Sequence, residues 1–508
     1  MPPTPDLSDV STMNARFCNW IKSFFNVICQ EVGLLQLSQQ NISKHGYVST
    51  IWLFLIRIQS SLVFWLVLIQ ARDFVFSTPI DPDPEIAEVE NNCDENDPID
   101  KSRQSGDRKK EKPKLHCLCI RLVTKGDRGA QPLIYNSINA ALKLFAAMCN
   151  CQHLKVHIVT ETQFITDSTK QEWLHQGATE VQEVFVPPNY QTPKGTLYKA
   201  RNLCYWQDVG GVGEECDETR SWILSLDEEA VVLRSLVQSF ITDVLENDRE
   251  SMIGFAISPA LIDVKSGKIS FWTKVMEARF VAWHYVLLRS RASVETGILF
   301  FHGGAFFVRA SVDRLLGNDC GMKESLAEDF STGVAATENK IPFKFLNGWF
   351  VEGTSENLKG LIINRARILR GQIYNICLNS ALSREQKSSL RLHLAIPIFY
   401  PIIHVIFSAL FLYPSSFFPA GPRCLILDLI FIFSLAVQAM AYTFGASYME
   451  MSNKEILACV LLSPITILYV APTVEALIVV RAAQCMVKEW WTGSTSFDIT
   501  KKSGSKTD

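Results

Sequence analysis

The sequence lacks an excess of charge of one sign, cysteines at zinc-site spacing and internal repeats. Its 49 Lys and Arg residues nearly balance 52 Asp and Glu residues, for a net charge of −3. This balance gives no electrostatic reason to expect a nucleic-acid partner. The 14 cysteines are scattered, and the C-x-C pairs Cys117/Cys119 and Cys149/Cys151 are typical of small buried hydrophobic side chains. We therefore expect reduced thiols, as in a cytosol-facing protein.

Long hydrophobic runs are present near both ends of the chain. The candidate membrane-spanning segments are residues 47–69, 392–412, 425–448 and 456–480. The first starts too far from Met1 and is too long for a cleaved signal peptide. Pro464 and Pro472 interrupt the last segment, which is predicted either to cross the bilayer or to re-enter it. These runs predict an integral membrane protein.

Basic residues around these segments predict the orientation of the protein. They follow the first segment between Arg103 and Lys114 and precede the second between Arg384 and Arg391, which places the central region in the cytosol. The sequon at Asn41 is compatible with a lumenal N-terminus. The expected location is a membrane of the endoplasmic reticulum or Golgi, with the central domain facing the cytosol. The side of the C-terminus stays open, because four crossings favour the lumen whereas the basic C-terminal residues favour the cytosol.

Composition divides the rest of the chain into further units. Residues 1–46 are an N-terminal tail in which an amphipathic helix is one reading, and residues 70–114 are a charged linker with little to bury. A central domain is predicted at residues 115–357, followed by a basic interfacial segment at 358–391. Residues 481–508 form a C-terminal tail.

Strand and helix patterns alternate in the central domain. Strands are predicted at residues 119–127, 154–161, 181–187 and from Trp222, and helices at residues 133–149 and 232–244. This order predicts an α/β fold with a mostly parallel sheet and helices on both faces. The ligands of such sheets bind at the carboxyl ends of the strands.

Polar residues follow three of these strands, and we expect them to form one site. They are Lys125-Gly126-Asp127, Thr160-Glu161 and Asp227-Glu228-Glu229. The last group has two readings. Asp227 caps the next helix, with the two Glu residues near the positive end of its dipole, or the carboxylates hold a divalent cation through hard oxygens.

Three downstream motifs add candidate site residues. Gly303-Gly304 forms a turn before an apolar strand. Glu328-Asp329 lies at the start of a helix, where a carboxylate is either a cap or a base. Arg365, Arg367 and Arg370 are close together, either as headgroup-binding residues or as a clamp on phosphate oxygens.

Taken in order, these segments resemble the family-2 glycosyltransferases of the GT-A fold, and within them the Egghead-like beta-1,4-mannosyltransferases. The resemblance covers about residues 115–371 and rests on "RLVTKGD", "VPPNYQTPKGTLYKARNLCY", "WILSLDEE", "SLAEDF" and "NRARILRG". It implies a GT-A Rossmann-like α/β sheet flanked by transmembrane helices. It also implies a membrane enzyme that uses GDP-mannose and a glycolipid or lipid-linked acceptor.

The resemblance implies a role for each candidate residue. Asp227 and Glu229 correspond to the D-x-D pair that binds Mn²⁺ or Mg²⁺. Asp329 corresponds to the general base, with Glu328 beside it, and Arg367 neutralises charge on the leaving nucleotide. The remaining residues are near the nucleotide (Thr124, Asp127, Lys199, Arg201, and Glu161, where relatives often carry Asp) or border the acceptor (Gly303, Gly304).

One motif departs from the family pattern. The Q-x-x-R-W motif reads Asn364-Arg365-Ala366-Arg367-Ile368, which keeps the arginine and loses the aromatic residue of the acceptor surface. The leading hypothesis is inverting hexosyl transfer. The alternatives are a processive polysaccharide synthase and a non-catalytic membrane scaffold that retains a degenerate transferase domain.

Overall fold

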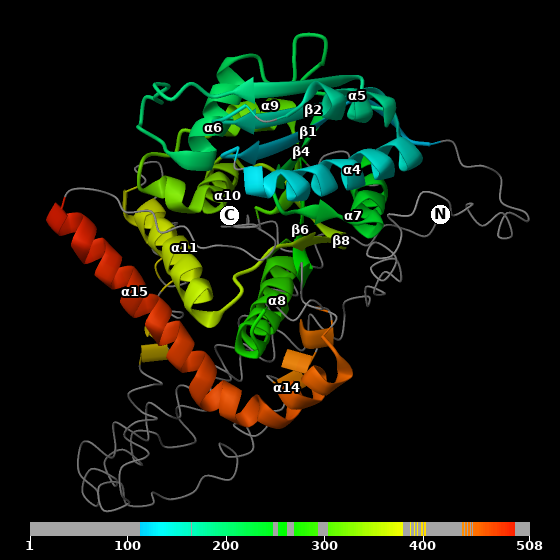
Figure 1. Cartoon of the computed structure of the whole chain (residues 1–508). Coiled ribbons are helices and arrows are strands. Elements are labelled where there is room, and N and C mark those ends of the chain that lie inside the picture. The colour runs from blue at the N-terminus through cyan, green and yellow to red at the C-terminus, as the bar shows by residue number, and fades with distance from the viewer. Residues whose placement is uncertain are drawn as a thin grey trace, which may run out of the picture. The chain divides into compact units, whose positions relative to one another are not determined.

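The computed structural model describes residues 112–126, 128–163, 165–246, 252–261, 269–292, 303–378 and 451–492, with scattered positions between 387 and 449 (Figure 1). The predicted segment at residues 47–69, the N-terminal tail and nearly all of the charged linker lie outside these residues. The predicted segments at 392–412 and 425–448 lie mostly outside them.

The described strands form one mixed eight-stranded sheet in the order β3-β2-β1-β4-β7-β6-β8-β5. β1 is parallel to β2 and β4, and β2 is parallel to β3. β7 is antiparallel to both β4 and β6, whereas β6 and β8 are parallel. The bounds are β1 (Lys114–Thr124), β2 (Asn150–Thr160), β3 (Glu180–Phe185), β4 (Ser221–Asp227), β5 (Val231–Val232), β6 (Ile253–Leu261), β7 (Ala305–Arg309) and β8 (Phe343–Glu352).

Helices cover both faces of this sheet, which confirms the α/β expectation in its coarse form (Figure 1). Alternate side chains of β1 enter two cores. Leu118 and Ile120 pack in one core with helix α4, and Cys119 and Val123 pack in the other with α6. A strand buried on both faces reads as a continuous apolar run, as the sequence of β1 does.

The helices of the central domain are α4 (Gln131–Met148), α5 (Asp167–His175), α6 (Tyr198–Asp208), α7 (Arg234–Ser239), α8 (Phe271–Ala292), α9 (Ala310–Leu316), α10 (Glu328–Glu338) and α11 (Leu358–Leu378). Shorter segments are η2 (Arg128–Ala130), the π-helical η3 (Phe240–Glu246) and η4 (Glu324–Ala327). α14 (Asn453–Ile465), the π-helical η5 (Thr466–Val470) and α15 (Ala471–Thr492) follow near the C-terminus. α4 begins where Pro at its first turn needs no N–H partner, and Ile134, Ile138 and Phe145 form its buried stripe.

The helix expected after Asp227 begins later than predicted. Residues 231–232 form strand β5, which pairs with Val351 and Phe350 of β8, and α7 starts at Arg234 with Leu233 as its N-cap. The interpretation of Asp227 as a helix cap is therefore wrong. A β-branched Val-Val pair favours the pleated edge of the sheet when a partner strand is available, and that partner is distant in sequence.

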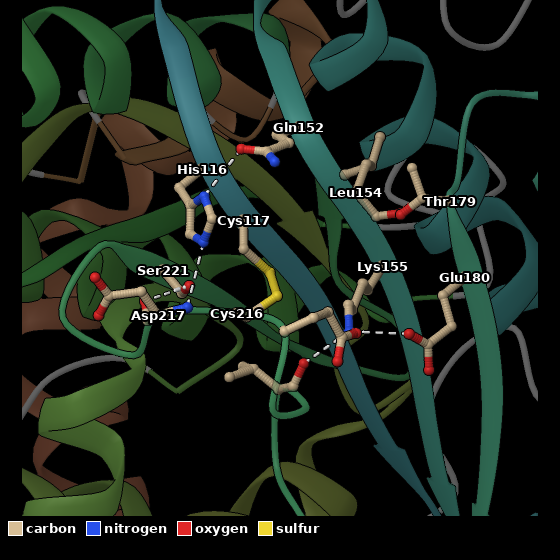
Figure 2. The surroundings of a disulfide bond; sticks show 12 residues. His116, Cys117, Gln152, Leu154, Lys155, Thr179, Glu180, Cys216, Asp217 and Ser221 are labelled. Atoms are coloured by element: carbon tan, nitrogen blue, oxygen red, sulfur yellow. Dashed lines mark hydrogen bonds and ion pairs between the residues drawn. A yellow bond between two sulfur atoms is a disulfide. The ribbon is translucent and has the colours of Figure 1, made fainter.

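The expectation that the cysteines are reduced is wrong for one pair. Cys117 of β1 and Cys216 form a disulfide with their Cα atoms 6.0 Å apart, within the usual range for such bonds. Figure 2 shows its surroundings, where the ring of His116 lies between Gln152 Oε1 (3.1 Å) and the backbone nitrogen of Asp217 (3.3 Å). Spacing in the sequence hid this pair because 99 residues separate the two cysteines. Cys119 and Cys149 are buried free thiols, as expected.

Among the residues that the structure describes, no helix combines the length and the apolar character needed to cross a bilayer. The predicted segment at residues 456–480 comprises most of α14, all of η5 and the first half of α15. The helix type changes at Thr466 and again at Ala471, close to Pro464 and Pro472. Both prolines therefore lie near breaks in the regular α-helical hydrogen bonding.

Candidate active site

The predicted polar strand ends meet at one edge of the sheet. In the parallel register, Thr124 aligns with Thr160 and Val123 aligns with Asp227, so β1, β2 and β4 end side by side. Thr124 Oγ1 donates a hydrogen bond to Glu228 Oε2 (2.8 Å), which links the ends of β1 and β4. The structure thus brings Thr124 and Asp227 together, as the strand pattern predicted, whereas Asp127 lies outside the described residues.

Lys199 joins three carboxylates at this edge. Its Nζ lies 2.5 Å from Asp227 Oδ1, 3.4 Å from Glu328 Oε1 and 3.8 Å from Asp329 Oδ1. Burial alone would lower the pKa of Lys199, but the surrounding carboxylates raise it above its usual value. α6 therefore places a permanent positive charge between the end of β4 and the start of α10.

The backbone next to Lys199 has an uncommon conformation. Tyr198, the first residue of α6, has φ 56°, a left-handed value that non-glycine residues rarely adopt. Nζ of Lys125 lies 5.7 Å from the centroid of the Tyr198 ring. Such backbone strain is found most often at functional sites.

Asp329 lies in the first turn of α10, where the sequence placed a cap or a base. Burial raises the pKa of Asp329 to about 8, with the nearby Lys199 opposing this shift and the acidic neighbours Glu328 and Asp227 adding to it. A carboxyl group with a pKa near the working pH is well suited to accept a proton from a sugar hydroxyl.

Gly303 and Gly304 lie directly against the carboxylates. A Cβ at Gly303 would lie 1.9 Å from Asp329 Oδ2, and a Cβ at Gly304 would lie 2.7 Å from Glu352 Oε2. The carbonyl oxygen of Gly304 accepts a hydrogen bond from the backbone N–H of Asp227 (2.9 Å). The two glycines are thus required for the close approach of the acidic side chains.

Glu352 is a residue of this site that the sequence analysis missed. Burial raises the pKa of Glu352 well above its usual value, and the negative charge of Asp227 raises it further. Glu352 is the last residue of β8, which runs in the same direction as β4, so both strands end at the same edge. A carboxylate at the end of an apolar run was the available signal, the same signal that marked Asp227.

The predicted nucleotide-side residues form an ion pair. Arg201 Nη2 lies 3.1 Å from Glu161 Oε1, which connects α6 to the end of β2. Lys199 and Arg201 are two residues apart on α6, and their charges act on different strand ends. Both residues contact side chains at the carboxyl edge of the sheet.

The three arginines of α11 have different partners in the structure. Arg365 pairs with Glu277 of α8 (2.8 Å), and Arg370 pairs with Glu489 of α15 (2.9 Å). Arg367 donates to Asn364 Oδ1 (3.1 Å), and its charge lowers the pKa of Asp329. The three therefore do not form a single clamp, and Arg367 is the one whose charge acts on the candidate base.

The carboxylates at the strand ends are of the chemical type that binds a divalent cation. Asp227, Glu328 and Asp329 surround one positively charged group, the ammonium of Lys199, which stands where a cation would balance their charge. Carboxylate oxygens are the ligands that Mg²⁺ and Mn²⁺ prefer. Glu229, the second predicted ligand, is buried. Within the described ranges, no group of three or more His, Cys, Asp or Glu side chains is arranged as a metal site.

Comparison with known proteins identifies the class of this molecule. Residues 222–471 match the family model described as "Glycosyl transferase family group 2". That range begins at the second residue of β4 and includes the acidic end of that strand, the candidate base and the arginines of α11. An α/β sheet with carboxylates and a candidate base at one edge agrees with this class. The chain therefore contains a glycosyltransferase domain that matches family group 2 over residues 222–471.

The related proteins have more specific names than the family model. The chain is 26% identical to Beta-1,4-mannosyltransferase bre-3 of Caenorhabditis briggsae, over 65% of this chain and 66% of the relative. It is 24% identical to Beta-1,4-mannosyltransferase egh of Drosophila melanogaster, over 68% of this chain and 70% of the relative. The chain thus resembles the Egghead-like beta-1,4-mannosyltransferases, as its motifs indicated. The chain spans 66% of the length of the C. briggsae relative.

Several solved structures are also similar to this chain, and one of them is a mannosyltransferase. The mannosyltransferase PcManGT from Pyrobaculum calidifontis, in complex with GDP-Man and Mn²⁺, aligns at 14% identity with a TM-score of 0.39, over 80% of this chain and 98% of that chain.

Proposed function

We propose that this glycosyltransferase moves a mannosyl residue from GDP-mannose to a glycolipid or lipid-linked acceptor, with inversion at the anomeric carbon. The observation that carries the proposal is the convergence of Asp227, Asp329 and Lys199 within 3.8 Å contacts at one edge of the sheet. The two relatives named beta-1,4-mannosyltransferases support mannose as the transferred sugar.

Asp329 acts as the general base in this proposal. Its carboxylate accepts the proton of the acceptor hydroxyl while that oxygen attacks the anomeric carbon. Gly303, whose missing side chain leaves room for the carboxylate, keeps the base against the turn that borders the acceptor. Glu328, one residue earlier and 3.4 Å from Lys199, supports the charge balance.

The leaving nucleotide is held by residues at the strand ends. Arg367 and Lys199 bring positive charge to the place where negative charge develops on the diphosphate. When bound at Asp227 and Glu229, Mn²⁺ or Mg²⁺ supplies further positive charge for that diphosphate. In this proposal Thr124 and Asp127 are near the base and ribose, Glu161 reaches the base, and Arg201 is near the nucleotide.

The proposed location is a membrane of the endoplasmic reticulum or Golgi, with the catalytic domain in the cytosol. The apolar runs at residues 47–69, 392–412 and 425–448 support membrane insertion, and the basic residues beside them support this orientation. A cytosolic domain has access to cytosolic nucleotide sugars and to acceptor lipids in the facing leaflet.

Membranes that contain the full chain provide the test. They are incubated with Mn²⁺ and radiolabelled GDP-mannose, UDP-glucose or UDP-N-acetylglucosamine, and the lipid fraction is extracted and sized. We expect label from GDP-mannose alone, as one added sugar per acceptor. Incorporation from none of a full nucleotide-sugar panel would reject an enzymatic role, and a labelled polymer would favour the processive synthase.

A further inference from the structure

The segment from α14 to α15 exposes a long apolar surface. Leu457, Leu461, Ile465 and Tyr469 recur every four residues along α14 and η5, and all are exposed. On α15 the exposed stripe consists of Leu477, Val480, Val487 and Trp491. Trp490 and Trp491 are 80% and 81% exposed, which is unusual because Trp is highly buried on average.

The opposite side of α15 is packed inside the protein. Val474, Ile478 and Ala482 are buried in a core that they share with Leu361 and Ala366 of α11. α15, drawn in red in Figure 1, runs alongside α11. The two sides of α15 therefore differ in role, because one side holds the helix on the domain while the other remains apolar and exposed.

The charges of this segment are also divided between the two sides. Its acidic residues Glu455, Glu475 and Glu489 form ion pairs with Lys274, Arg279 and Arg370 of the catalytic domain. Lys454 and Lys488 are exposed, and Lys488 lies on an open surface of α15 together with Val480, Val487 and Trp491. Internal pairing of the acids leaves a surface that presents apolar and basic groups.

This combination of apolar and basic groups is typical of helices that bind at a membrane surface. Helices with a broad apolar face, Trp at one end and basic residues at the border lie in the plane of a membrane surface, where the apolar face enters the acyl boundary. Trp is enriched at the headgroup level, and lysine stems extend along apolar surface toward anionic headgroups.

We propose that the exposed face of α14, η5 and α15 rests in the plane of an anionic bilayer surface, with Lys454 and Lys488 at the headgroups. The inference deepens the proposed function, since it rests on a lipid acceptor and states how the site meets the membrane. The buried pair Arg370–Glu489 joins α15 to α11, the helix that carries Arg367, so the bilayer contact and the leaving-group site belong to one packed unit.

Depth-dependent fluorescence quenching tests this placement. A genetically encoded fluorescent amino acid replaces Leu461 or Val487 in the full chain, which is reconstituted in vesicles of phosphatidylcholine and phosphatidylserine with brominated acyl chains. The matched control is the same amino acid at Leu315, which is 60% exposed on α9. We expect strong and similar quenching at both test positions by bromine near the headgroups, and none at position 315.

Two results would overturn the inference. No quenching at positions 461 and 487 would mean that protein, either another part of this chain or a second copy, covers the face. If bromine near the headgroups quenches one position and bromine deep in the acyl chains quenches the other, the segment crosses the bilayer. These readouts do not depend on transfer, so an inactive enzyme with both positions quenched would reject the proposed function and retain this inference.

The charge component has its own test. In the K454E/K488E variant, phosphatidylserine should no longer increase quenching at position 487, whereas the K454R/K488R variant should behave as the parent protein. An unchanged phosphatidylserine effect in the K454E/K488E variant would overturn the assignment of these lysines to the headgroups.

Discussion

At the residue scale, the candidate base depends on its surroundings more than on its position in a helix. Asp329 accepts a proton only as a carboxylate, and burial raises its pKa to about 8. In Asp329→Asn we expect transfer to slow by roughly a hundredfold or more, the usual scale of general-base catalysis, with donor affinity nearly unchanged. Donor titration and single-turnover transfer on one solubilised preparation measure both. Glu328→Gln is the control and should do less.

The same pKa gives this prediction a pH dependence. As the pH rises through the pKa of Asp329, the carboxylate fraction increases, so the wild-type rate should rise toward about pH 8 and then level off. The residual rate of Asp329→Asn should lack this step. Normal turnover by the variant, with the same pH profile, would remove Asp329 from the mechanism.

A substitution at Asp227 distinguishes a role in metal and donor binding from a role as a helix cap. Because Leu233 is the N-cap of α7, Asp227 has no capping role to lose. Asp227→Asn should therefore weaken divalent-ion and donor binding by tenfold or more while leaving thermal stability close to that of the wild type. Calorimetric titration with Mn²⁺ and GDP-mannose measures this effect. Full donor affinity in the variant, or full wild-type activity in excess chelator, would contradict a metal role.

A substitution at Gly303 tests whether the transfer rate depends on the close approach of this glycine to the Asp329 carboxylate. A Cβ at this position would lie 1.9 Å from Asp329 Oδ2, so Gly303→Ala must displace the carboxylate or the turn. We expect the transfer rate to fall by tenfold or more, since small displacements of a reacting group are costly. Gly360→Ala in α11, where the nearest atom would be 3.1 Å away, is the matched control and should keep near-normal transfer. Equal transfer rates in the two variants would contradict this fit.

At the element scale, the junction of α11 and α15 depends on a buried ion pair. Arg370 and Glu489 are 1% and 3% exposed, and the second carboxylate oxygen of Glu489 accepts a hydrogen bond from Tyr374 (2.6 Å). Glu489→Gln leaves Arg370 buried without its counter-charge, which should lower the free energy of unfolding by about 3–5 kcal/mol. Thermal unfolding in detergent measures the loss.

A double substitution separates charge from packing at this junction. Arg370→Met with Glu489→Leu removes both charges and keeps apolar volume, so it should recover much of the lost stability. Recovery would assign the loss to an uncompensated charge. If Glu489→Gln melts like the wild type, α15 is held by its apolar contacts alone.

At the scale of the whole molecule, one covalent bond links distant parts of the chain. The disulfide Cys117–Cys216 closes a loop of about 100 residues that contains β1 to the loop before β4. Loop-closure entropy predicts that Cys216→Ser lowers the free energy of unfolding by roughly 2–4 kcal/mol. Denaturant unfolding of wild type with and without reductant should reproduce the same difference.

This experiment also bears on the proposed location. Structural disulfides are rare in cytosolic domains, where thiols are kept reduced. If reductant leaves the unfolding curve of the wild type unchanged, the two thiols are unpaired in the protein, as the cysteine pattern alone indicated.

The sequence alone determined the parts of this protein that depend on local pattern. Two-residue and helical periodicity predicted β1, β2, β3, β4 and α4 to within a few residues, and the acidic strand end at Asp227 predicted the edge at which the site lies. Buried parallel strands and amphipathic helices carry their burial pattern in neighbouring residues, so no distant contact is needed to recognise them.

Tertiary structure decided what depends on partners that are distant in sequence. β5 is a strand because β8 pairs with it, and Glu352 belongs to the site because β8 ends at the same edge of the sheet as β4. Cys117 is oxidised because residue 216 packs against β1, and Arg370 faces Glu489 rather than phosphate because α15 covers α11. Pairing, burial and charge are set by neighbours in space, and one sequence read along its length does not specify which neighbours those are.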